Sequence, residues 1–376
     1  MKLTRKKILW IVAALAFVAM VVGYLGLSYF TGYGDFGFWK TSYYRVHKVP
    51  NFAENYDLYV YPDMTENDIL KELKDGAGMN DSALMSAAFE EAIEEAEDEG
   101  VASAKIRPGK YMVSKSDPSI YVARMLVRGW QTPQMLTLSG TMRTKGVIAK
   151  KISNQMMVDS TTVANALNDE EFLSRYGFTA AEVYGMLLPD TYEMYWTASI
   201  EEIFDRFKQE YDAFWTPERL AMAEKQKLTP KEVSVVASIV SGETIKDFEY
   251  PIIAGVYLNR YRKGIKLQAD PTVCFCFDYT LDRVLNKHLT FDSPYNTYKY
   301  AGLPPAPINV PPKACLEAVL NPQKHDYMFF CASAAFDLTH KFAVTYSEHL
   351  KNAREFQTEL TRRQKEKAAA QAAAAN

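Results

Sequence analysis

The sequence predicts an α+β protein in which an N-terminal transmembrane helix precedes a small mixed domain and a larger α+β domain. A long uncharged segment stands near the N-terminus, and the rest of the chain alternates short strand patterns with amphipathic helix patterns. The chain has 376 residues, of which 48% are hydrophobic. It is therefore long enough for two hydrophobic cores, and its composition argues against global disorder.

The N-terminal segment has the features of an uncleaved membrane anchor. Residues 8–30 carry no charge and match the roughly 20 residues that a helix needs to cross a bilayer. Four basic residues precede them: Lys2, Arg5, Lys6 and Lys7. The alternative is a cleaved signal peptide, but the segment exceeds the usual apolar core of about 7–15 residues, and no small-x-small site precedes Gly32. We expect a cytoplasmic tip and anchor in residues 1–30 and a juxtamembrane linker in residues 31–50.

This anchor predicts where the rest of the chain lies. Positive charges before a membrane span favour an N-terminus in the cytoplasm, so the domains should lie outside the cytoplasm, tethered to the cytoplasmic (inner) membrane. The formal net charge is −3, and no basic stripe follows the anchor. Binding to nucleic acid is therefore not expected.

Residues 51–130 are expected to form the small mixed domain. Residues 58–62 alternate in hydrophobicity as a strand does. Thr65 opens a helix, with Asp68 three residues later in the pattern of a capping box. Residues 117–129 form an amphipathic helix that ends at a glycine.

Residues 131–362 are expected to form the larger domain, and residues 363–376 a low-complexity tail that is helix-prone but unpacked. Residues 199–244 are strongly helical. One helix should start at Thr229-Pro230, because proline is tolerated in the first turn. A further helix is expected over residues 250–264.

The first candidate catalytic residue is Glu243, which follows an apolar run. Ile239 and Val240 lie four and three residues before it, so the three side chains share one helical face. If that face points inward, the carboxyl group is dehydrated and its pKa rises, as suits a general acid. A plainer interpretation is that Glu243 caps the next segment or pairs with Lys246 or Arg260.

Polar residues further along the chain would line a groove beside Glu243. Asn259 falls late in the helix of residues 250–264, on the same face as Val256. Residues 265–275 are expected to be extended, so that alternate polar side chains line one side of the groove. These side chains are Gln268, Asp270 and Thr272.

Two more segments contribute candidates. Residues 293–308 end in GLPPAPI, whose prolines exclude a central strand, so the segment is either an irregular surface loop or a stiff wall of the site. Its candidate substrate-binding residues are Asn296, Thr297 and Tyr298. Asp190 lies in a turn and is either a cap or a second carboxylate.

Metal and disulfide chemistry find little support in the sequence. None of the five histidines shows metal-ligand spacing, so neither a metal nor another cofactor is expected. Cys274 and Cys276 are too close for a C-x-x-C motif. Whether the four cysteines are buried thiols or form disulfides stays open, because disulfides can form outside the cytoplasm.

Five sequence blocks, in this order, resemble the MltG (YceG-like) family of endolytic murein transglycosylases. The blocks are GMLLPDTYEMY, ASIVSGET, AGVYLNRYRKGIKLQADPTV, SPYNTYKYAGLPPAPI and YMFFCAS…FAVTYSEHLKN. The resemblance implies a membrane anchor, a LysM-like α/β subdomain in residues 51–130 and a catalytic domain in residues 131–362. It also implies a lyase that cuts peptidoglycan glycan strands outside the cytoplasm, with peptidoglycan synthases as partners.

The resemblance also assigns residues. The family's helix block usually reads A-S-I-[IV]-E-K-E-T, and its second Glu, which we take as catalytic, falls on Glu243. The first Glu is Ser241 here and the Lys is Gly242, which leaves fewer charges near Glu243. Family positions around the saccharide fall on Asn259, Gln268, Asp270, Asn296 and Tyr298.

The resemblance implies that Glu243 is the single acid/base and that the product carries a 1,6-anhydro end. One alternative is a two-carboxylate muramidase, with Asp190 or Asp270 as the partner of Glu243. A second is a non-enzymatic glycan-binding scaffold of the wall-synthesis machinery, which the Ser241-Gly242 pair favours. A third, an anchored binding domain with no role in the wall, requires the five ordered blocks to be a coincidence.

Overall fold

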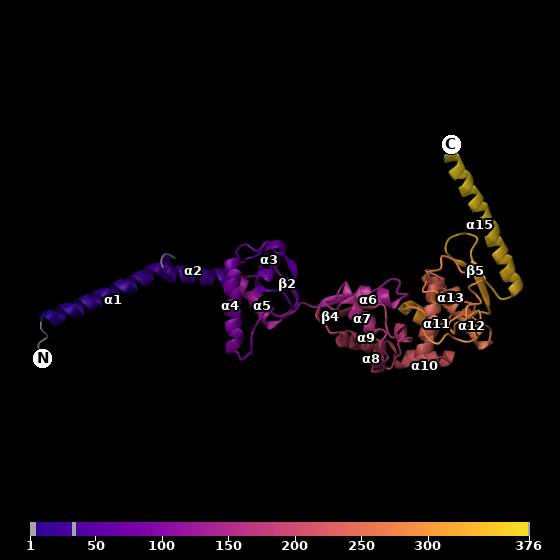
Figure 1. Cartoon of the computed structure of the whole chain (residues 1–376), viewed down its shortest axis with the longest axis horizontal. Helices are drawn as coiled ribbons and strands as arrows, with labels where there is room; N and C mark the ends of the chain where they lie inside the picture. Colours follow the sequence, from indigo (N-terminus) through magenta and orange to yellow (C-terminus); the bar gives the residue numbers. More distant parts are fainter. Residues whose placement is uncertain (1–4, 32–34, 375–376) are drawn as a thin grey trace. The chain divides into compact units, whose positions relative to one another are not determined.

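The computed structural model describes residues 5–31 and 35–374 (Figure 1). The chain divides into two compact units, one made of Met1–Gln134 with Tyr195–Thr197 and the other of Met135–Met194 with Ala198–Asn376. Each unit has its own hydrophobic core.

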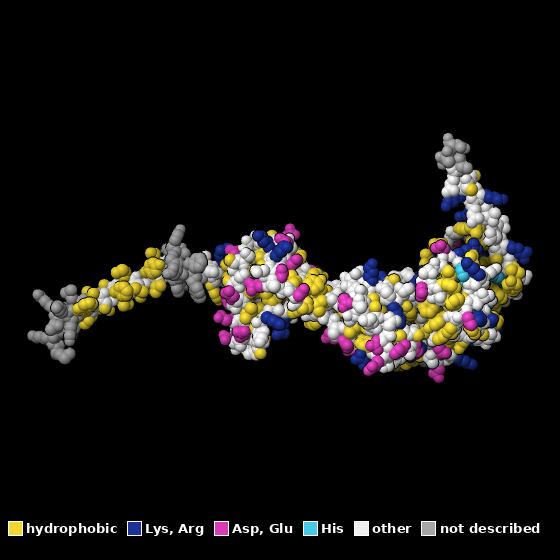
Figure 2. Space-filling view, in the orientation of Figure 1, with side chains coloured by type: hydrophobic (Ala, Val, Ile, Leu, Met, Phe, Trp, Pro, Cys, Tyr) yellow, Lys and Arg dark blue, Asp and Glu magenta, His cyan; other side chains and the backbone are white. Residues whose placement is uncertain are grey.

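Helix α1 (Arg5–Thr31) has the length and composition of a single membrane span. Its stretch Trp10–Leu27 has a mean hydropathy of 2.3, and none of it is buried in the protein. Figure 2 shows hydrophobic side chains along this helix. So much exposed apolar surface indicates a partner such as lipid. Lys2 and Gly32, on which the expected orientation and the missing cleavage site partly rest, lie outside the described residues.

The segment expected as a linker is helical over most of its length. Helix α2 runs from Asp35 to Lys48, and its Val46 is only 4% exposed in the core of the first unit. Arg45 pairs with Asp81 at 3.0 Å. The end of this segment therefore belongs to the folded unit, because a buried valine and an ion pair hold it there.

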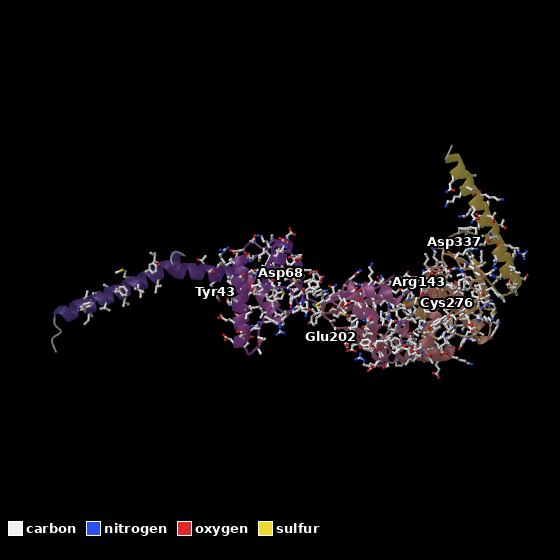
Figure 3. The ribbon with its side chains drawn as sticks, in the orientation of Figure 1. Tyr43, Asp68, Arg143, Glu202, Cys276 and Asp337 are labelled. Atoms are coloured by element: carbon white, nitrogen blue, oxygen red, sulfur yellow. The ribbon has the colours of Figure 1, made fainter. Side chains whose placement is uncertain are left out.

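The first unit is a two-stranded antiparallel sheet packed with helices. Strand β1 (Tyr56–Val60) pairs with β2 (Gly109–Val113) in the register Tyr56 to Val113. The helices are α3 (Glu66–Gly76), α4 (Ser82–Asp98) and α5 (Ser119–Arg128). The predicted capping box is confirmed, with Thr65 and Asp68 bonded in both directions; Asp68 is labelled in Figure 3. The LysM-like character of this unit stays a prediction.

The second unit is mostly helical, with two small antiparallel pairs of strands. One pair is β3 (Gln134–Leu138) with β4 (Asp190–Met194), and the other is β5 (Phe329–Ala332) with β6 (His340–Ala343). Its first helices are α6 (Lys145–Ser153), α7 (Ser160–Ala166), α8 (Glu170–Ser174), the 3-10 turn η1 (Val183–Gly185), α9 (Ile200–Phe214) and α10 (Pro217–Gln226). The remainder are α11 (Pro230–Glu243), the 3-10 turn η2 (Asp247–Glu249), α12 (Tyr250–Arg262), α13 (Asp270–Cys276), α14 (Lys313–Leu320) and α15 (Tyr346–Ala374).

Helix α11 is the centre of the second unit. It packs against α12, α13 and α14, and every residue from Val233 to Val240 is buried. The predicted start is confirmed: Thr229 caps the helix and Pro230 occupies its first position. A helix that is apolar on all sides must be enclosed by others. Its last residue, Glu243, is therefore brought to the edge of the core.

The expectation of an extended chain over residues 265–275 is wrong. Residues from Asp270 onward form α13, because Pro271 falls in the first turn, where a missing N–H costs nothing. The Thr272 hydroxyl donates back to the carbonyl of Ala269 at 2.7 Å. Asp270 and Thr272 therefore follow helical directions instead of alternating, whereas Gln268 precedes the helix.

The structure settles two smaller points. All four cysteines are free thiols. The expected tail is the continuation of α15, and its residues 363–371 are exposed along this part of the helix.

A close contact between α11 and α13 predicts the effect of one substitution. A Cβ atom on Gly242 would lie 2.6 Å from Cβ and 2.8 Å from Cγ of Pro271, a stiff ring. Gly242→Ala should therefore destabilise the protein by about 1–3 kcal/mol, as overpacking does. The control is Gly146→Ala in α6, where the nearest atom lies 4.0 Å away, so the change should be neutral or stabilising by up to about 1 kcal/mol. Calorimetry of the full chain tests this pair, and equal unfolding midpoints for the two variants would contradict the predicted contact.

Candidate active site

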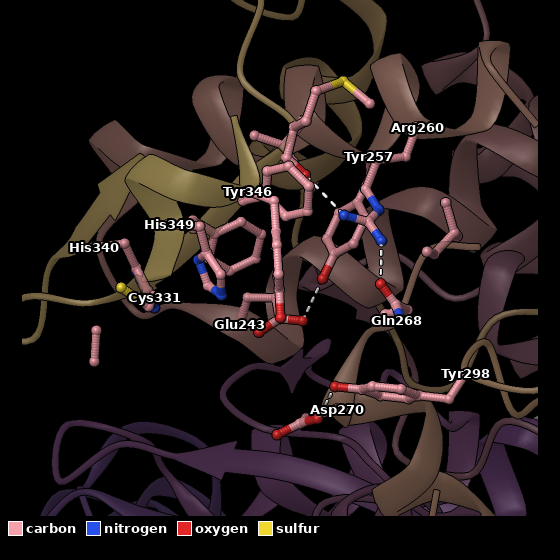
Figure 4. Close-up of a pocket in the computed structure, with 16 residues that line it drawn as sticks. Glu243, Tyr257, Arg260, Gln268, Asp270, Tyr298, Cys331, His340, Tyr346 and His349 are labelled. Atoms are coloured by element: carbon pink, nitrogen blue, oxygen red, sulfur yellow. Dashed lines mark hydrogen bonds between the residues drawn. The ribbon is translucent and has the colours of Figure 1, made fainter. Parts of the chain in front are cut away.

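Glu243 lines a cavity of about 450 Å³ in the second unit (Figure 4). The residue is partly exposed, whereas its carboxyl group is buried. The prediction that its helical face points inward is confirmed, since Ile239 and Val240 are both 0% exposed. A single carboxyl group thus ends a buried helix and faces an open space.

The surroundings of Glu243 favour its protonated form. Burial raises the pKa of Glu243 to about 7, the negative charge of Asp270 adds to the rise, and a hydrogen bond from Tyr257 opposes it. The Tyr257 hydroxyl donates to Oε1 of Glu243. Burial also raises the pKa of Tyr257 well above its usual value, so the hydroxyl remains a donor at neutral pH. A carboxyl group with a pKa near 7 can both give and take a proton.

The plainer interpretation of Glu243 is not supported. Among the described residues, neither Lys246 nor Arg260 makes an ion pair with its carboxyl group. The helix C-cap is the next residue, Thr244, which is 6% exposed. Glu243 is therefore a cavity group rather than a surface ion-pair partner.

Two of the predicted residues form a second acidic corner of the cavity. The Tyr298 hydroxyl donates to Oδ1 of Asp270 at 2.6 Å. Asp270 is the first residue of α13, and its charge contributes to the raised pKa of Glu243. This corner can support positive charge on a ligand next to the acid.

A third predicted residue, Gln268, lies on the cavity wall with Arg260. Gln268 has a φ of 55°, in the left-handed region that non-glycine residues rarely adopt. Its N–H donates to the carbonyl of Thr297 at 3.1 Å, and its side-chain oxygen accepts from Nη2 of Arg260. These two bonds hold a strained residue in place, a situation that is common at functional sites.

The other predicted residues do not line the cavity. Nδ2 of Asn259 donates to the carbonyls of His325 at 2.9 Å and Tyr327 at 3.2 Å. Thr272 and Thr297 are 0% and 2% exposed, and their hydroxyls lie 2.9 Å apart. These three side chains hold neighbouring segments together behind the wall.

Asn296 and Asp190 also have structural contacts. Asn296 is 0% exposed, its Nδ2 donates to two carbonyls, and its Oδ1 accepts from the N–H of Tyr298 at 3.0 Å. It thus shapes the turn that presents Tyr298, which fits the stiff-wall interpretation of this segment. Asp190 pairs with Lys313, and that hydrogen bond lowers the pKa of Asp190. Asp190 therefore has a structural partner and does not line the cavity of Glu243.

The sequence reasoning missed a buried cluster beside the cavity. Glu249 is 1% exposed and accepts bonds from the Thr244 hydroxyl (2.8 Å), the His340 N–H (2.7 Å) and the His340 Nδ1 (2.9 Å). His340 lines the cavity. No local pattern could reveal this pair, because 91 residues separate its members.

Tyr257, Arg260 and His349 were also missed as cavity residues. Tyr257 could have been found from the sequence, because the helix that carries it was predicted and Tyr257 lies three residues before Arg260, on the same helical face. The sequence pattern had instead drawn attention to the helical face that carries Asn259. His349 comes from α15, far along the chain, and only the fold brings it to the cavity.

Comparison with known proteins gives a consistent result. The model of the YceG-like family matches residues 58–355. An endolytic murein transglycosylase of Bacillus subtilis (strain 168) is 31% identical over 219 residues, which cover 54% of this chain and 60% of that protein. One from Streptococcus pneumoniae serotype 2 (strain D39) is 28% identical over 176 residues, which cover 46% of this chain and 32% of that protein. The chain thus spans less than two thirds of these relatives.

A solved structure supports the same fold. The crystal structure of a YceG-like protein from Listeria monocytogenes matches with a TM-score of 0.54 and 25% identity. The match covers 79% of this chain and 98% of that one. The mixed α and β architecture described above is therefore shared with a YceG-like protein.

The raised pKa of Glu243 predicts a change of stability with pH. The folded protein keeps this proton up to a pKa of about 7, whereas the unfolded chain releases it near the ordinary glutamate pKa of 4.5. The stabilisation is thus complete below pH 4.5 and is lost as the pH rises through 7, and it amounts to about 3 kcal/mol relative to Glu243→Gln.

Urea unfolding of the full chain at a series of pH values measures this difference. Glu224→Gln, a change on the exposed side of α10, is the control and should follow the wild type. Identical pH profiles for wild type and Glu243→Gln would show that the carboxyl group of Glu243 ionises as it does in water.

Proposed function

The chain belongs to the YceG-like family, and on that premise we propose that it is a membrane-anchored endolytic lytic transglycosylase of peptidoglycan. The observation that carries the proposal is a cavity whose buried carboxyl group, Glu243, has a pKa raised to about 7. Relatives that match about half of this chain are named endolytic murein transglycosylases, which supports the same activity.

The proposed reaction uses Glu243 twice. Its carboxylic acid gives a proton to the oxygen of the β-1,4 bond between N-acetylmuramic acid and N-acetylglucosamine, and the bond from C1 to that oxygen breaks. The carboxylate then takes the proton of the muramoyl C6 hydroxyl, whose oxygen bonds to C1. The proton returns to Glu243, no water is consumed, and a 1,6-anhydro end remains. The attack within one sugar relies on proximity rather than on a second protein nucleophile.

The polar groups near Glu243 suit this reaction. Positive charge develops on the sugar as the bond breaks, and the carboxylate of Asp270, fixed by Tyr298, lies in the same cavity to stabilise it. Gln268 lines the cavity as well, whereas Asn259 is used elsewhere. The presence of Asp270 also supports a second candidate function, a two-carboxylate muramidase in which Asp270 activates water.

The anchor and the partners complete the proposal. Helix α1 would hold the enzyme in the cytoplasmic membrane with its N-terminus inside and both folded units outside. Nascent glycan strands emerge at that surface, so an enzyme tethered there would meet them before they are incorporated. Peptidoglycan synthases are the partners expected at this location.

Mass spectrometry of digested glycan strands tests the reaction. The full chain in detergent micelles should create 1,6-anhydromuramoyl ends within the strands. Glu243→Gln should reduce the rate by about 10²–10⁴-fold, because it cannot give or take the proton. Glu224→Gln, outside the cavity, should cut at the normal rate. Ends that have gained water would identify a muramidase instead, and full activity in a folded Glu243→Gln would remove Glu243 from the mechanism.

The pH dependence of kcat should move in opposite directions in two variants. Tyr257→Phe removes the hydrogen bond that lowers the pKa of Glu243, so the fall in activity at alkaline pH should shift to higher pH. Asp270→Asn removes the charge that raises this pKa, so the same fall should shift to lower pH. Tyr261→Phe, on the same helix as Tyr257, serves as the control. A shift of the same sign in both variants would contradict the assignment of this limb to Glu243.

A further inference from the structure

Arg260 is a buried cation with neutral partners only. The residue is 5% exposed, and its guanidinium donates to the carbonyls of Lys266 (2.9 Å) and Met328 (2.8 Å) and to the side-chain oxygen of Gln268. Within residues 5–31 and 35–374, no carboxylate pairs with it. Buried arginines normally have an anionic partner, because desolvating an unpaired charge is costly. The anionic partner of Arg260 is therefore a candidate for a bound ligand.

The carboxyl groups of the cavity do not fill this role. Oε1 of Glu243 accepts a bond from Tyr257, and with a pKa of about 7 this group is largely uncharged below neutral pH. Oδ1 of Asp270 is bonded to Tyr298. Two of the five guanidinium N–H groups of Arg260 remain without a partner in the described part of the chain.

A second basic side chain with an unused nitrogen lines the same cavity. Nδ1 of His349 is buried and has no hydrogen-bond partner among the described residues. Its ring stacks on Phe329 at 5.5 Å, and the guanidinium carbon of Arg260 lies 5.4 Å from the centre of the same ring. In the view of Figure 4, the nitrogens of His349 are turned toward Glu243. Burial and the charge of Arg260 lower the pKa of His349, so at neutral pH its ring is uncharged and can contribute a hydrogen bond to a ligand but no charge.

Gln268 holds the Arg260 guanidinium without neutralising it. An amide oxygen accepts the bond at a position where a glutamate of the same shape would supply a full negative charge. The chain keeps this residue at a left-handed φ of 55°. The strained backbone of Gln268 thus lies next to the charge of Arg260, which no carboxylate neutralises among the described residues. Strained residues of this kind are common at ligand sites.

We propose that Arg260, with His349 on the wall of the same cavity, forms a carboxylate-binding subsite in the cavity of Glu243. A carboxylate fits because its two oxygens match the planar fork of a guanidinium. The identity of the ligand rests on the proposed function. On a peptidoglycan strand the carboxylate belongs either to the lactyl group of a muramoyl residue that has lost its peptide or to the stem peptide.

The test compares the binding of two pairs of glycan strands, and the members of each pair differ only in their carboxylates. They are peptide-free strands with free lactyl groups, the same strands with amidated lactyl groups, peptide-bearing strands, and peptide-bearing strands with amidated carboxyl groups. The protein is the full chain in detergent carrying Glu243→Gln, so that dissociation constants are measured without turnover. At least one free strand should bind about tenfold or more tightly than its amidated counterpart, as for a hydrogen-bonded ion pair. The pair that differs identifies the source.

Gln268→Glu, added to the same protein, asks whether Arg260 is responsible. This change keeps the shape of the side chain and places an internal carboxylate on Arg260, so the preference for free carboxylates should disappear. Gln209→Glu is the matched control, because Gln209 also accepts a bond from an arginine, Arg206 (3.3 Å), on the exposed side of α9. It should leave the preference unchanged.

The outcomes separate this subsite from the proposed function. Equal binding of free and amidated strands, or a preference that survives Gln268→Glu, overturns the subsite while the cleavage reaction stands. Failure of all four strands to bind, together with absence of cleavage by the wild type, contradicts the proposed function and the subsite with it.

Discussion

The burial of helix α11 constrains the arrangement of the second unit. Its residues from Val233 to Val240 are enclosed by other helices, and the helix ends with the carboxyl group of Glu243 buried at the cavity. That burial is the largest cause of the raised pKa of Glu243. Tyr257 from α12 moderates the effect, and Gly242 lets α13 approach closely enough to add the charge of Asp270. Burial thus causes most of the rise in the pKa of Glu243, and the contacts with Tyr257 and Asp270 adjust it.

The departure from the family's helix block becomes understandable in this setting. The Ser241 hydroxyl lies 2.9 Å from both the carbonyl of Ser238 and Oδ1 of Asn309 and can donate its one proton to either, and Gly242 lies against Pro271. Neither residue lines the cavity. The two positions therefore change how the helix packs and leave the groups that face a ligand in place. The chain keeps the acid, its tyrosine partner and the acidic corner, which weakens the case for a scaffold without activity.

Local rules of sequence explain what could be predicted. The start of α11 follows from a capping threonine and a proline, and the inward face before Glu243 follows from residues spaced three and four apart. The same rules, applied to Pro271, would have revealed α13 in place of the expected extended segment. The pairing of Glu249 with His340 and the arrival of His349 depend on contacts between distant segments. Sequence periodicity does not encode such contacts. The positions of His340 and His349 at the cavity could therefore be learned only from the fold.

The proposed mechanism requires Glu243 to carry a proton near neutral pH, and the pKa of this residue can be measured directly. Isotope-edited infrared spectroscopy of the full chain, labelled at glutamate carboxyl groups, would follow the C=O stretch of the protonated acid. The signal that is absent from Glu243→Gln identifies the residue. We predict that this signal titrates with a midpoint near pH 7, in line with the raised pKa. A midpoint near the ordinary glutamate pKa of 4.5 would show an ordinary ionised carboxylate and contradict a mechanism that begins with proton donation from Glu243.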